Sequence, residues 1–245
     1  MTPDGSELKA TRSNGARVGD VAAALEELIF AEFVPGSSLP SEADLALRLG
    51  VSRLTLREAA KSLQARGLLT VSKGRRPVVA HLTSGPVGDF FGTAVRRDPR
   101  RLLDLLEIRQ ALEVQSAALA AARVSRASLA ALEASLAAMK EGELDAVAFN
   151  EADLQFHESL AGATGNQMLI FLIEALADPL HTSRMQSYRG HLARGRGIAE
   201  VIEEHAKILE CVRAQDQGAA MAAMRDHLAS TERDLRAGLP TTNGE

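Results

Sequence analysis

The chain has 245 residues, enough for one or two domains with hydrophobic cores of their own. Only 3% of the residues are aromatic and Trp is absent, while Ala and Leu are abundant, which favours helix-on-helix packing over a sheet protein. The net charge of −4 is uneven: residues 1–82 hold 11 basic and 9 acidic side chains, whereas residues 83–245 hold 17 and 23, so affinity for nucleic acid is expected in the front part alone.

The sequence shows no pattern of a disulfide, a signal peptide or a membrane span. The single Cys211 excludes an intramolecular disulfide and fits a reducing cytoplasm. No apolar run approaches the roughly 18–20 residues that cross a bilayer, so no membrane partner is expected. Residues 1–16 lack the hydrophobic stretch of a signal peptide and are predicted to form a disordered arm.

Residues 17–82 have the pattern of a small helical DNA-binding domain. A first helix is predicted over Val18–Phe33, where apolar residues recur at helical spacing. Ser41 is a good N-cap for a second, short helix, and Gly50 follows it where a positive φ is favourable. Ser52 is the predicted N-cap of a third helix, which ends at Gly67.

A β-hairpin with a basic tip is predicted after the third helix. Residues 68–71 and 78–80 are short β-prone runs, and the sequence between them contains Lys73, Gly74, Arg75 and Arg76. From residue 48 to residue 76 the chain has eight basic side chains and a single acid, Glu58. The arrangement of two short helices, a turn and a basic hairpin indicates a winged helix-turn-helix.

The third helix is the predicted recognition helix. Arg53, Thr55 and Arg57 lie near its start, away from its apolar face. A helix N-terminus with such side chains can bind phosphate and reach base edges in the major groove. The residues predicted to contact DNA on this helix and on the wing are Ser52, Arg53, Thr55, Arg57, Lys73, Gly74 and Arg75. The alternative is an ordinary solvated basic face.

The remainder of the chain is predicted to be helical. Residues 83–99 read as a linker, residues 100–237 as an all-α antiparallel bundle, and residues 238–245 as a flexible tail. Ser187–Gly197, which is rich in Gly, is predicted to be a loop. The predicted helices of the bundle are Arg101–Arg123, Ser125–Glu141, Glu143–Ala161, Asn166–Gln186, Ile198–Gln215 and Ala219–Arg236.

Four polar side chains lie on the apolar stripes of three of these helices. His205 and His227 each interrupt a hydrophobic stripe, and Asp153 and His157 are one turn apart beside Phe156. One carboxylate and three imidazoles are a natural set of ligands for Zn²⁺, Ni²⁺ or a similar divalent ion. The alternative is a buried Asp–His hydrogen-bond network without metal, because a buried carboxylate needs a partner in either case.

Arg109 is a further polar residue on an apolar face. Leu residues flank it on its own helix, so its guanidinium is expected to point inward. It could pair with Glu113 one turn later on the same helix. No spacing selects His181, Arg184 or Asn166 as further ligand contacts. The last two histidines, His81 beside the wing and His191 in the predicted loop, are expected to be solvated.

The segment LPSEADLALRLGVSRLTLREAAKSLQARGLLTV resembles the DNA-binding domain of the GntR family of bacterial transcription regulators. In that family the residues matching Ser52, Arg53, Thr55, Arg57 and Gly74 contact operator DNA, which the resemblance implies for this chain. Ala43 stands where many relatives have a DNA-contacting Arg, and Leu54 replaces a usual Thr or Ser. The resemblance therefore implies DNA binding but does not give the operator sequence.

The second half resembles the ligand-sensing FCD domain of the FadR subfamily of these regulators. The resemblance rests on Asp153-x-x-x-His157, on His205-x-x-Ile208-Leu209 and on Met224-x-x-His227-Leu228. It implies that Asp153, His157, His205 and His227 bind a metal ion. It also implies that Arg109 holds the carboxylate of an effector beside that ion.

These observations predict a cytoplasmic, homodimeric transcription regulator without enzymatic activity. Its winged helix-turn-helix would bind double-stranded operator DNA, and a small organic or sugar acid in the helical domain would control that binding. Repression that the ligand relieves is the commoner mode among the family that the chain resembles. Two alternatives stay open: a metal-dependent hydrolase that uses the Asp/His₃ set, and a purely architectural DNA-binding dimer.

Overall fold

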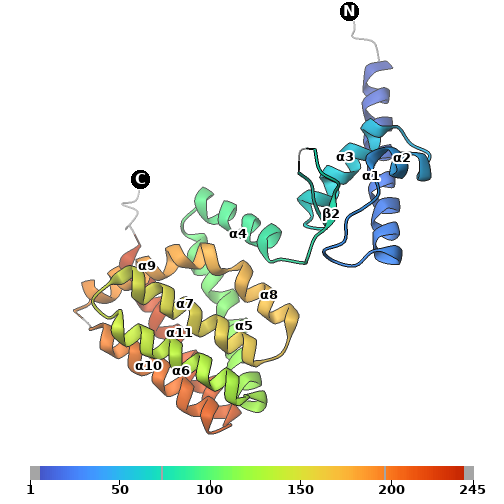
Figure 1. Cartoon of the computed structure of the whole chain (residues 1–245). Helices are drawn as coiled ribbons and strands as arrows, with labels where there is room; N and C mark the ends of the chain where they lie inside the picture. The colour runs from blue at the N-terminus through green and yellow to red at the C-terminus, as the bar shows by residue number, and fades with distance from the viewer. Residues whose placement is uncertain (1–5, 73, 196, 240–245) are drawn as a thin grey trace, which may run out of the picture. The chain divides into compact units, whose positions relative to one another are not determined.

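The computed structural model describes residues 6–72, 74–195 and 197–239 (Figure 1). Three helices and a small hairpin form its N-terminal part. The chain separates into two units, Met1–Pro86 and Val87–Glu245. The helices of the first unit are α1 (Ser6–Glu32), α2 (Glu42–Arg48) and α3 (Arg53–Ala65). Its strands are β1 (Leu69–Thr70) and β2 (Val78–Val79), which pair antiparallel with Leu69 opposite Val79.

The capping residues predicted for the helix-turn-helix are confirmed. The Ser41 hydroxyl accepts from the backbone N–H of Asp44 and the Ser52 hydroxyl accepts from that of Thr55, at 3.2 and 3.1 Å. Each cap satisfies one of the backbone donors that a helix start leaves unpaired. Gly50 takes a φ of +65°, so the turn between α2 and α3 uses a conformation that side chains with a Cβ disfavour.

The first unit has a hydrophobic core formed by one face of each helix. Leu25 and Ile29 of α1 pack with Leu45 of α2 and Leu56 and Leu63 of α3, and all five are buried. Leu69 of β1 and Val79 of β2 also belong to this core, so the hairpin packs against the helices. The predicted fold class, a winged helix-turn-helix before a helical bundle, is confirmed.

Helix α1 is longer than the predicted Val18–Phe33. It begins at Ser6, so the predicted disordered arm of residues 1–16 is wrong for residues 6–16, and residues 1–5 lie outside the described part. No Pro occurs between Ser6 and Glu32, and the stretch from Glu7 to Arg12 consists largely of residues with good helix propensity. Extending an existing helix costs less than starting a new one.

The second unit is a helical bundle. Helix α11 packs against α5, α9 and α10. Helix α6 packs against α7 and α10, and α5 also packs against α7. Fully buried side chains such as Leu106, Leu132, Phe156 and Leu228 fill its core. The bounds are α4 (Gly85–Arg97), α5 (Arg101–Arg123), α6 (Arg126–Glu141), α7 (Ala146–Ala163), α8 (Gln167–Ala175), α9 (Ala177–Ala193), α10 (Ile198–Arg213) and α11 (Gln217–Gly238).

The predicted linker, residues 83–99, consists mostly of helix α4. Pro86 is the second residue of this helix, where its missing N–H costs nothing. Val95 is buried in the core of the bundle, and Gly88 lies close to the carbonyl of Ala175 at the end of α8. Val95 and Phe91 pack against the core of the bundle, whereas Val87 and Phe90 of the same helix are exposed.

The predicted helix Asn166–Gln186 is confirmed except for an interruption at Leu176, and the predicted loop Ser187–Gly197 is wrong for residues 187–193. The helix is interrupted at Leu176, which lies between α8 and α9, and α9 then extends to Ala193. Gly190 serves close packing, because a Cβ at this position would fall 1.8 Å from the carbonyl oxygen of Asp234 on α11. The glycine that suggested a loop marks a place where two helix backbones meet.

Helix α11 ends at Gly238, where the predicted flexible tail of residues 238–245 begins, and residues 240–245 of that tail lie outside the described part. Within the described ranges, no helix has both the length and the apolar character to cross a membrane.

Candidate metal and effector site and DNA-binding face

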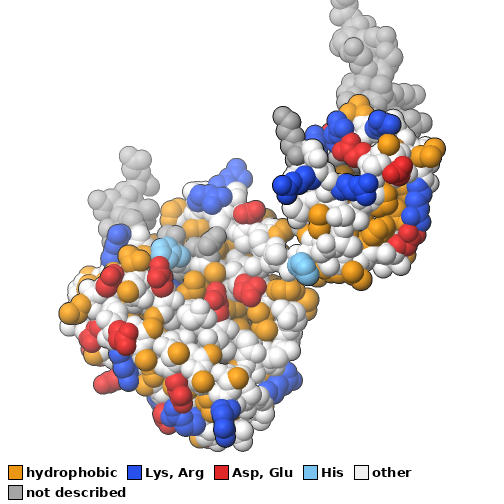
Figure 2. Space-filling model, in the orientation of Figure 1, with side chains coloured by type: hydrophobic (Ala, Val, Ile, Leu, Met, Phe, Trp, Pro, Cys, Tyr) orange, Lys and Arg blue, Asp and Glu red, His pale blue; other side chains and the backbone are white. Residues whose placement is uncertain are grey.

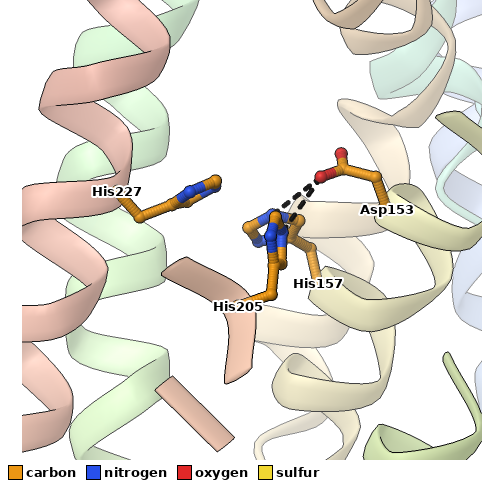
Figure 3. A group of neighbouring side chains, drawn as sticks. All are labelled: Asp153, His157, His205 and His227. Carbon is orange, nitrogen blue, oxygen red and sulfur yellow. Dashed lines mark hydrogen bonds and ion pairs between the residues drawn. The ribbon is translucent and has the colours of Figure 1, made fainter. Parts of the chain in front are cut away.

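Four side chains from three helices converge in the bundle core (Figure 3). Asp153 and His157 lie one turn apart on α7, which starts at the N-cap Asp145. His205 comes from α10 and His227 from α11, and each lies on the buried face of its helix. One ligand atom from each residue can be chosen so that all four lie within 4.8 Å of one another.

The spacing of these donor atoms suits one small metal ion. Nε2 of His205 lies 3.0 Å from Oδ1 of Asp153 and 3.4 Å from Nε2 of His157. Nε2 of His157 lies 3.8 Å from the same Asp153 oxygen. Ligands about 2.0–2.1 Å from a tetrahedral ion are about 3.3–3.4 Å from one another. The donor set of one carboxylate and three imidazoles therefore fits a divalent ion in chemistry. The spacing of the donor atoms of Asp153, His157 and His205 also fits it in size.

A second group of contacts orients the imidazole rings. Nδ1 of His205 donates to the carbonyl of Val201 at 2.8 Å, because a carbonyl can only accept. Nδ1 of His227 lies 2.9 Å from a carboxylate oxygen of Glu204, and Nδ1 of His157 lies 2.5 Å from one of Glu113. A proton on Nδ1 of His205 and of His227 leaves Nε2 of each ring with a lone pair, which is how acceptors behind a histidine prepare it to bind a metal.

Burial keeps two of the rings neutral. It lowers the pKa of His157 to about 4, despite the opposing charges of Glu113 and Asp153. Burial, together with the neighbouring His205, also lowers the pKa of His227. A metal ion binds the neutral form of histidine, so both rings are in the required state at neutral pH.

Two buried arginines lie beside the cluster. Arg184 on α9 forms an ion pair from Nε to Oδ2 of Asp153, which leaves Oδ1 directed at the histidines. Burial alone would raise the pKa of Asp153, but Arg184 and His205 outweigh it and hold that pKa well below its usual range. The carboxylate therefore remains charged inside the protein.

Arg109 pairs with Glu113, as one of the two interpretations of the sequence expected. Its Nε lies 2.6 Å from Oε1 and its Nη2 3.3 Å from Oε2 of that carboxylate, and both side chains are buried. Nη2 is also 3.4 Å from Nε2 of His157. This guanidinium therefore lies against the cluster, held by an acid of its own helix.

A small cavity of about 50 Å³ opens beside the cluster, with room for a few water-sized groups. Its wall includes Arg109, Asp153, Arg184 and His227, so the structure brings the predicted effector contact and two of the predicted metal ligands to one cavity. Other polar residues of the wall are Asn150, Ser187, Tyr188, His191, Glu204, Thr231 and Asp234.

Several of these residues were not found from the sequence. His191, expected in solvent, is 1% exposed; its ring nitrogens lie 2.9 Å from Asp234 and from the carbonyl of Gly197. Glu204 precedes His205 directly, and its position behind His227 depends on the contact between α10 and α11. His81 is exposed, as predicted. Only the packing of the helices shows which polar residues share the cavity.

The start of α3 carries the residues predicted to contact DNA. Ser52 is the N-cap, its hydroxyl lies 2.8 Å from that of Thr55, and Arg53 is exposed. Arg57 is also exposed, and Glu42 of α2 holds its fork, with N···O distances of 3.3 Å from Nε and 2.6 Å from Nη2. The hydrogen bond from Arg57 lowers the pKa of Glu42.

A groove runs between α3 and the wing, and Lys and Arg side chains are visible over the first unit beside acidic ones (Figure 2). Arg57, Gly74 and Arg75 line this groove together, and Gly74 has a φ of +74° at the tip of the wing. The predicted contact Lys73 lies outside the described residues. The sequence prediction did not include Lys61, Gln64 and Arg76, which also line the groove.

The two units match two known families. Residues 17–79 match the family described as bacterial regulatory proteins, gntR family, and residues 104–230 match the FCD domain. The Glc operon transcriptional activator of Escherichia coli K12 is 32% identical over 225 residues, which cover 88% of this chain and 87% of that protein. The galactonate operon transcriptional repressor of the same organism is 29% identical, over 86% of this chain and 93% of its own.

A solved structure agrees with this result. Streptococcus agalactiae GntR superimposes with a TM-score of 0.65 and 29% identity, and the match covers 88% of this chain and 99% of that one. The two relatives are named as transcription regulators, and the matched regions cover 87% and 93% of their chains. The chain therefore belongs to the GntR family of bacterial transcription regulators, with an FCD ligand-binding domain behind its DNA-binding domain.

Proposed function

We propose that this regulator is a cytoplasmic homodimer whose binding to operator DNA depends on a small carboxylate. The carboxylate binds beside a divalent metal ion in the FCD domain. The observation that carries the proposal is the cluster of Asp153, His157, His205 and His227, whose donor atoms lie within 4.8 Å of one another. The orienting contacts behind the three imidazoles are those expected of metal ligands rather than of an ordinary core.

The cavity supports an anionic effector. The two guanidiniums of Arg109 and Arg184 lie in its wall, and a bound metal ion would add positive charge beside them. A planar guanidinium suits bidentate binding of a carboxylate. One relative is named for the galactonate operon, and galactonate is itself a carboxylate.

DNA binding is assigned to the start of α3 and to the wing. A single helix-turn-helix makes few base contacts, and such proteins pair with two-fold operators, so a homodimer is proposed. The proposed contacts are Ser52, Arg53, Thr55, Arg57, Lys73, Gly74 and Arg75. We propose repression that the effector relieves, in line with the galactonate operon repressor, and a coupling of about 1–3 kcal/mol between the two sites.

A hydrolase or an architectural role is less well supported. Two relatives that match 88% and 86% of this chain are named as regulators, one an activator and one a repressor. A domain that only dimerises would have no need of buried charges, which are costly unless they serve a purpose. We therefore assign the buried cluster to sensing.

The proposal is tested with purified full-length protein and the DNA upstream of its own gene. Melting temperature and band shifts are measured with a panel of organic and sugar acids, with and without a chelator. At least one acid should raise the melting temperature and weaken the DNA complex, and chelation should remove both effects. An absence of DNA binding with every acid and metal tested would refute the regulator proposal for this operator region.

Arg109→Lys should weaken effector binding by roughly tenfold or more, because Lys keeps a positive charge opposite Glu113 but loses the planar fork. Lys is the better test than Ala, because Arg109→Ala would leave the buried Glu113 without its main partner and cost about 3–5 kcal/mol of stability. The measurement is effector affinity by calorimetry.

The matched control is Arg123→Lys. Arg123 lies on the same helix, and its Nη1 donates to the carbonyl of Thr164, away from the cavity wall. This variant should bind the effector as the unchanged protein does. Equal affinity in Arg109→Lys would assign the carboxylate contact to another residue.

A further inference from the structure

Two residues of the cavity wall have buried polar atoms without a hydrogen-bond partner in the described part of the chain. They are Nη1 of Arg184 and Oδ1 of Asn150. Arg184 is 6% exposed and Asn150 is 3% exposed. A buried polar atom without a partner is costly, so two such atoms on residues of one cavity wall indicate that a ligand supplies the partners.

The two residues belong to neighbouring pairs of side chains that join α7 and α9, and each pair is called a rung below. On one rung, Arg184 pairs with Asp153; on the other, the Asn150 amide lies 2.6 Å from Nδ1 of His181. Asn150 precedes Asp153 by three residues, and His181 precedes Arg184 by three, so the rungs are on the order of 4.5 Å apart along each helix. A small ligand beside Asp153 and Arg184 would therefore have its neighbouring substituent beside Asn150.

The chemistry of the unpaired atoms defines what the ligand must offer. A guanidinium nitrogen needs an acceptor, which the effector carboxylate provides. The Asn150 amide can face the cavity with its oxygen or, if His181 holds the proton on Nδ1, with its nitrogen. A hydroxyl donates and accepts, so it satisfies the amide in both orientations, whereas a hydrocarbon substituent satisfies neither.

We propose that Asn150 selects hydroxy acids, by hydrogen bonding a hydroxyl close to the carboxylate that Arg184 binds. This inference rests on the proposed function, since it specifies the carboxylate class that the cavity accepts. A cavity built to pair a hydroxyl discriminates against the analogue without it, because its own polar group then stays unpaired. The Asn150 side chain thus determines specificity, and the arginines supply general affinity for carboxylates.

The test compares matched acids on the full-length, metal-loaded protein by calorimetry. The panel runs from glycolate and lactate to six-carbon sugar acids, each beside its analogue without the hydroxyl nearest the carboxylate, such as acetate and propionate. At least one hydroxy acid should bind roughly tenfold or more tightly than its analogue.

Asn150→Leu, which is close in shape and apolar, should reduce that ratio to about twofold or less while the analogue keeps its affinity. Asn150→Ala serves as the second variant if Leu packs poorly, and melting temperature checks the fold of both. The matched control is Gln155→Leu, an exposed amide on the same helix, which should keep the full ratio.

The outcomes separate the two proposals. Equal binding of hydroxy acids and their analogues by the unchanged protein would overturn the selectivity inference and leave the proposed carboxylate sensor in place. An unchanged ratio in both Asn150 variants would assign the hydroxyl contact to another residue and overturn the role of Asn150. Failure of every acid to bind would overturn the carboxylate sensor itself, and with it this inference.

Discussion

Replacing His205 and His227 together by Ala is expected to abolish metal binding. The loss of even one outer contact of a metal ligand typically costs about 10–100-fold in affinity, and this variant removes two direct ligands from two different helices. Metal content of dialysed protein, measured by elemental analysis, should fall from about one ion per chain to background. The effector should then no longer weaken the DNA complex.

His81→Ala is the matched control for this experiment. His81 is an exposed histidine of the first unit, so its loss should leave the metal content unchanged. Melting curves of the double variant show whether the bundle still unfolds cooperatively. Full metal occupancy in a folded double variant would show that Asp153 and His157 bind the ion without these histidines, or that the ion lies elsewhere.

Arg57→Ala is expected to weaken specific operator binding by about 1–3 kcal/mol, roughly 5- to 150-fold in Kd. Arg57 is exposed, lines the groove between α3 and the wing, and has its fork held in place by Glu42. A fork positioned in this way can pair with guanine or with phosphate at a small entropic cost. The measurement is operator affinity at a fixed salt concentration, beside affinity for unrelated DNA.

Arg66→Ala provides the comparison, since this arginine follows the same helix and also has a bidentate acidic partner. Glu26 of α1 holds it at 2.6 and 2.7 Å, and it is not part of the groove wall. Its replacement should change operator affinity little. If Arg57→Ala and Arg66→Ala behave alike, the groove is not the DNA-binding face.

The DNA-binding domain could be predicted well because its signals are local. Ser41 and Ser52 act as caps for backbone donors three residues away, and Gly50 takes a positive φ that its own position requires. Such interactions depend on the sequence within a few residues. The order of helix, turn, helix and hairpin followed directly from them.

Helix α9 shows where local signals fail. Its Gly and polar residues have low helix propensity, which predicts a loop, yet the chain there is helical to Ala193. Gly190 permits close contact with the backbone of Asp234, and that contact decides the conformation. Tertiary packing outweighed propensity, and it also buried His191, which was expected in solvent.

The sequence alone determined that Asp153, His157, His205 and His227 are polar residues on apolar helix faces, because the period of those faces is a local property. That the four bind a metal ion stays a prediction. The tertiary structure alone decided which groups stand behind and beside them. Glu204 reaches His227 across the contact of α10 with α11, and Arg184 reaches Asp153 across that of α9 with α7. Helical periodicity gives the direction of a side chain on its own helix, but only the packing of helices gives its neighbours.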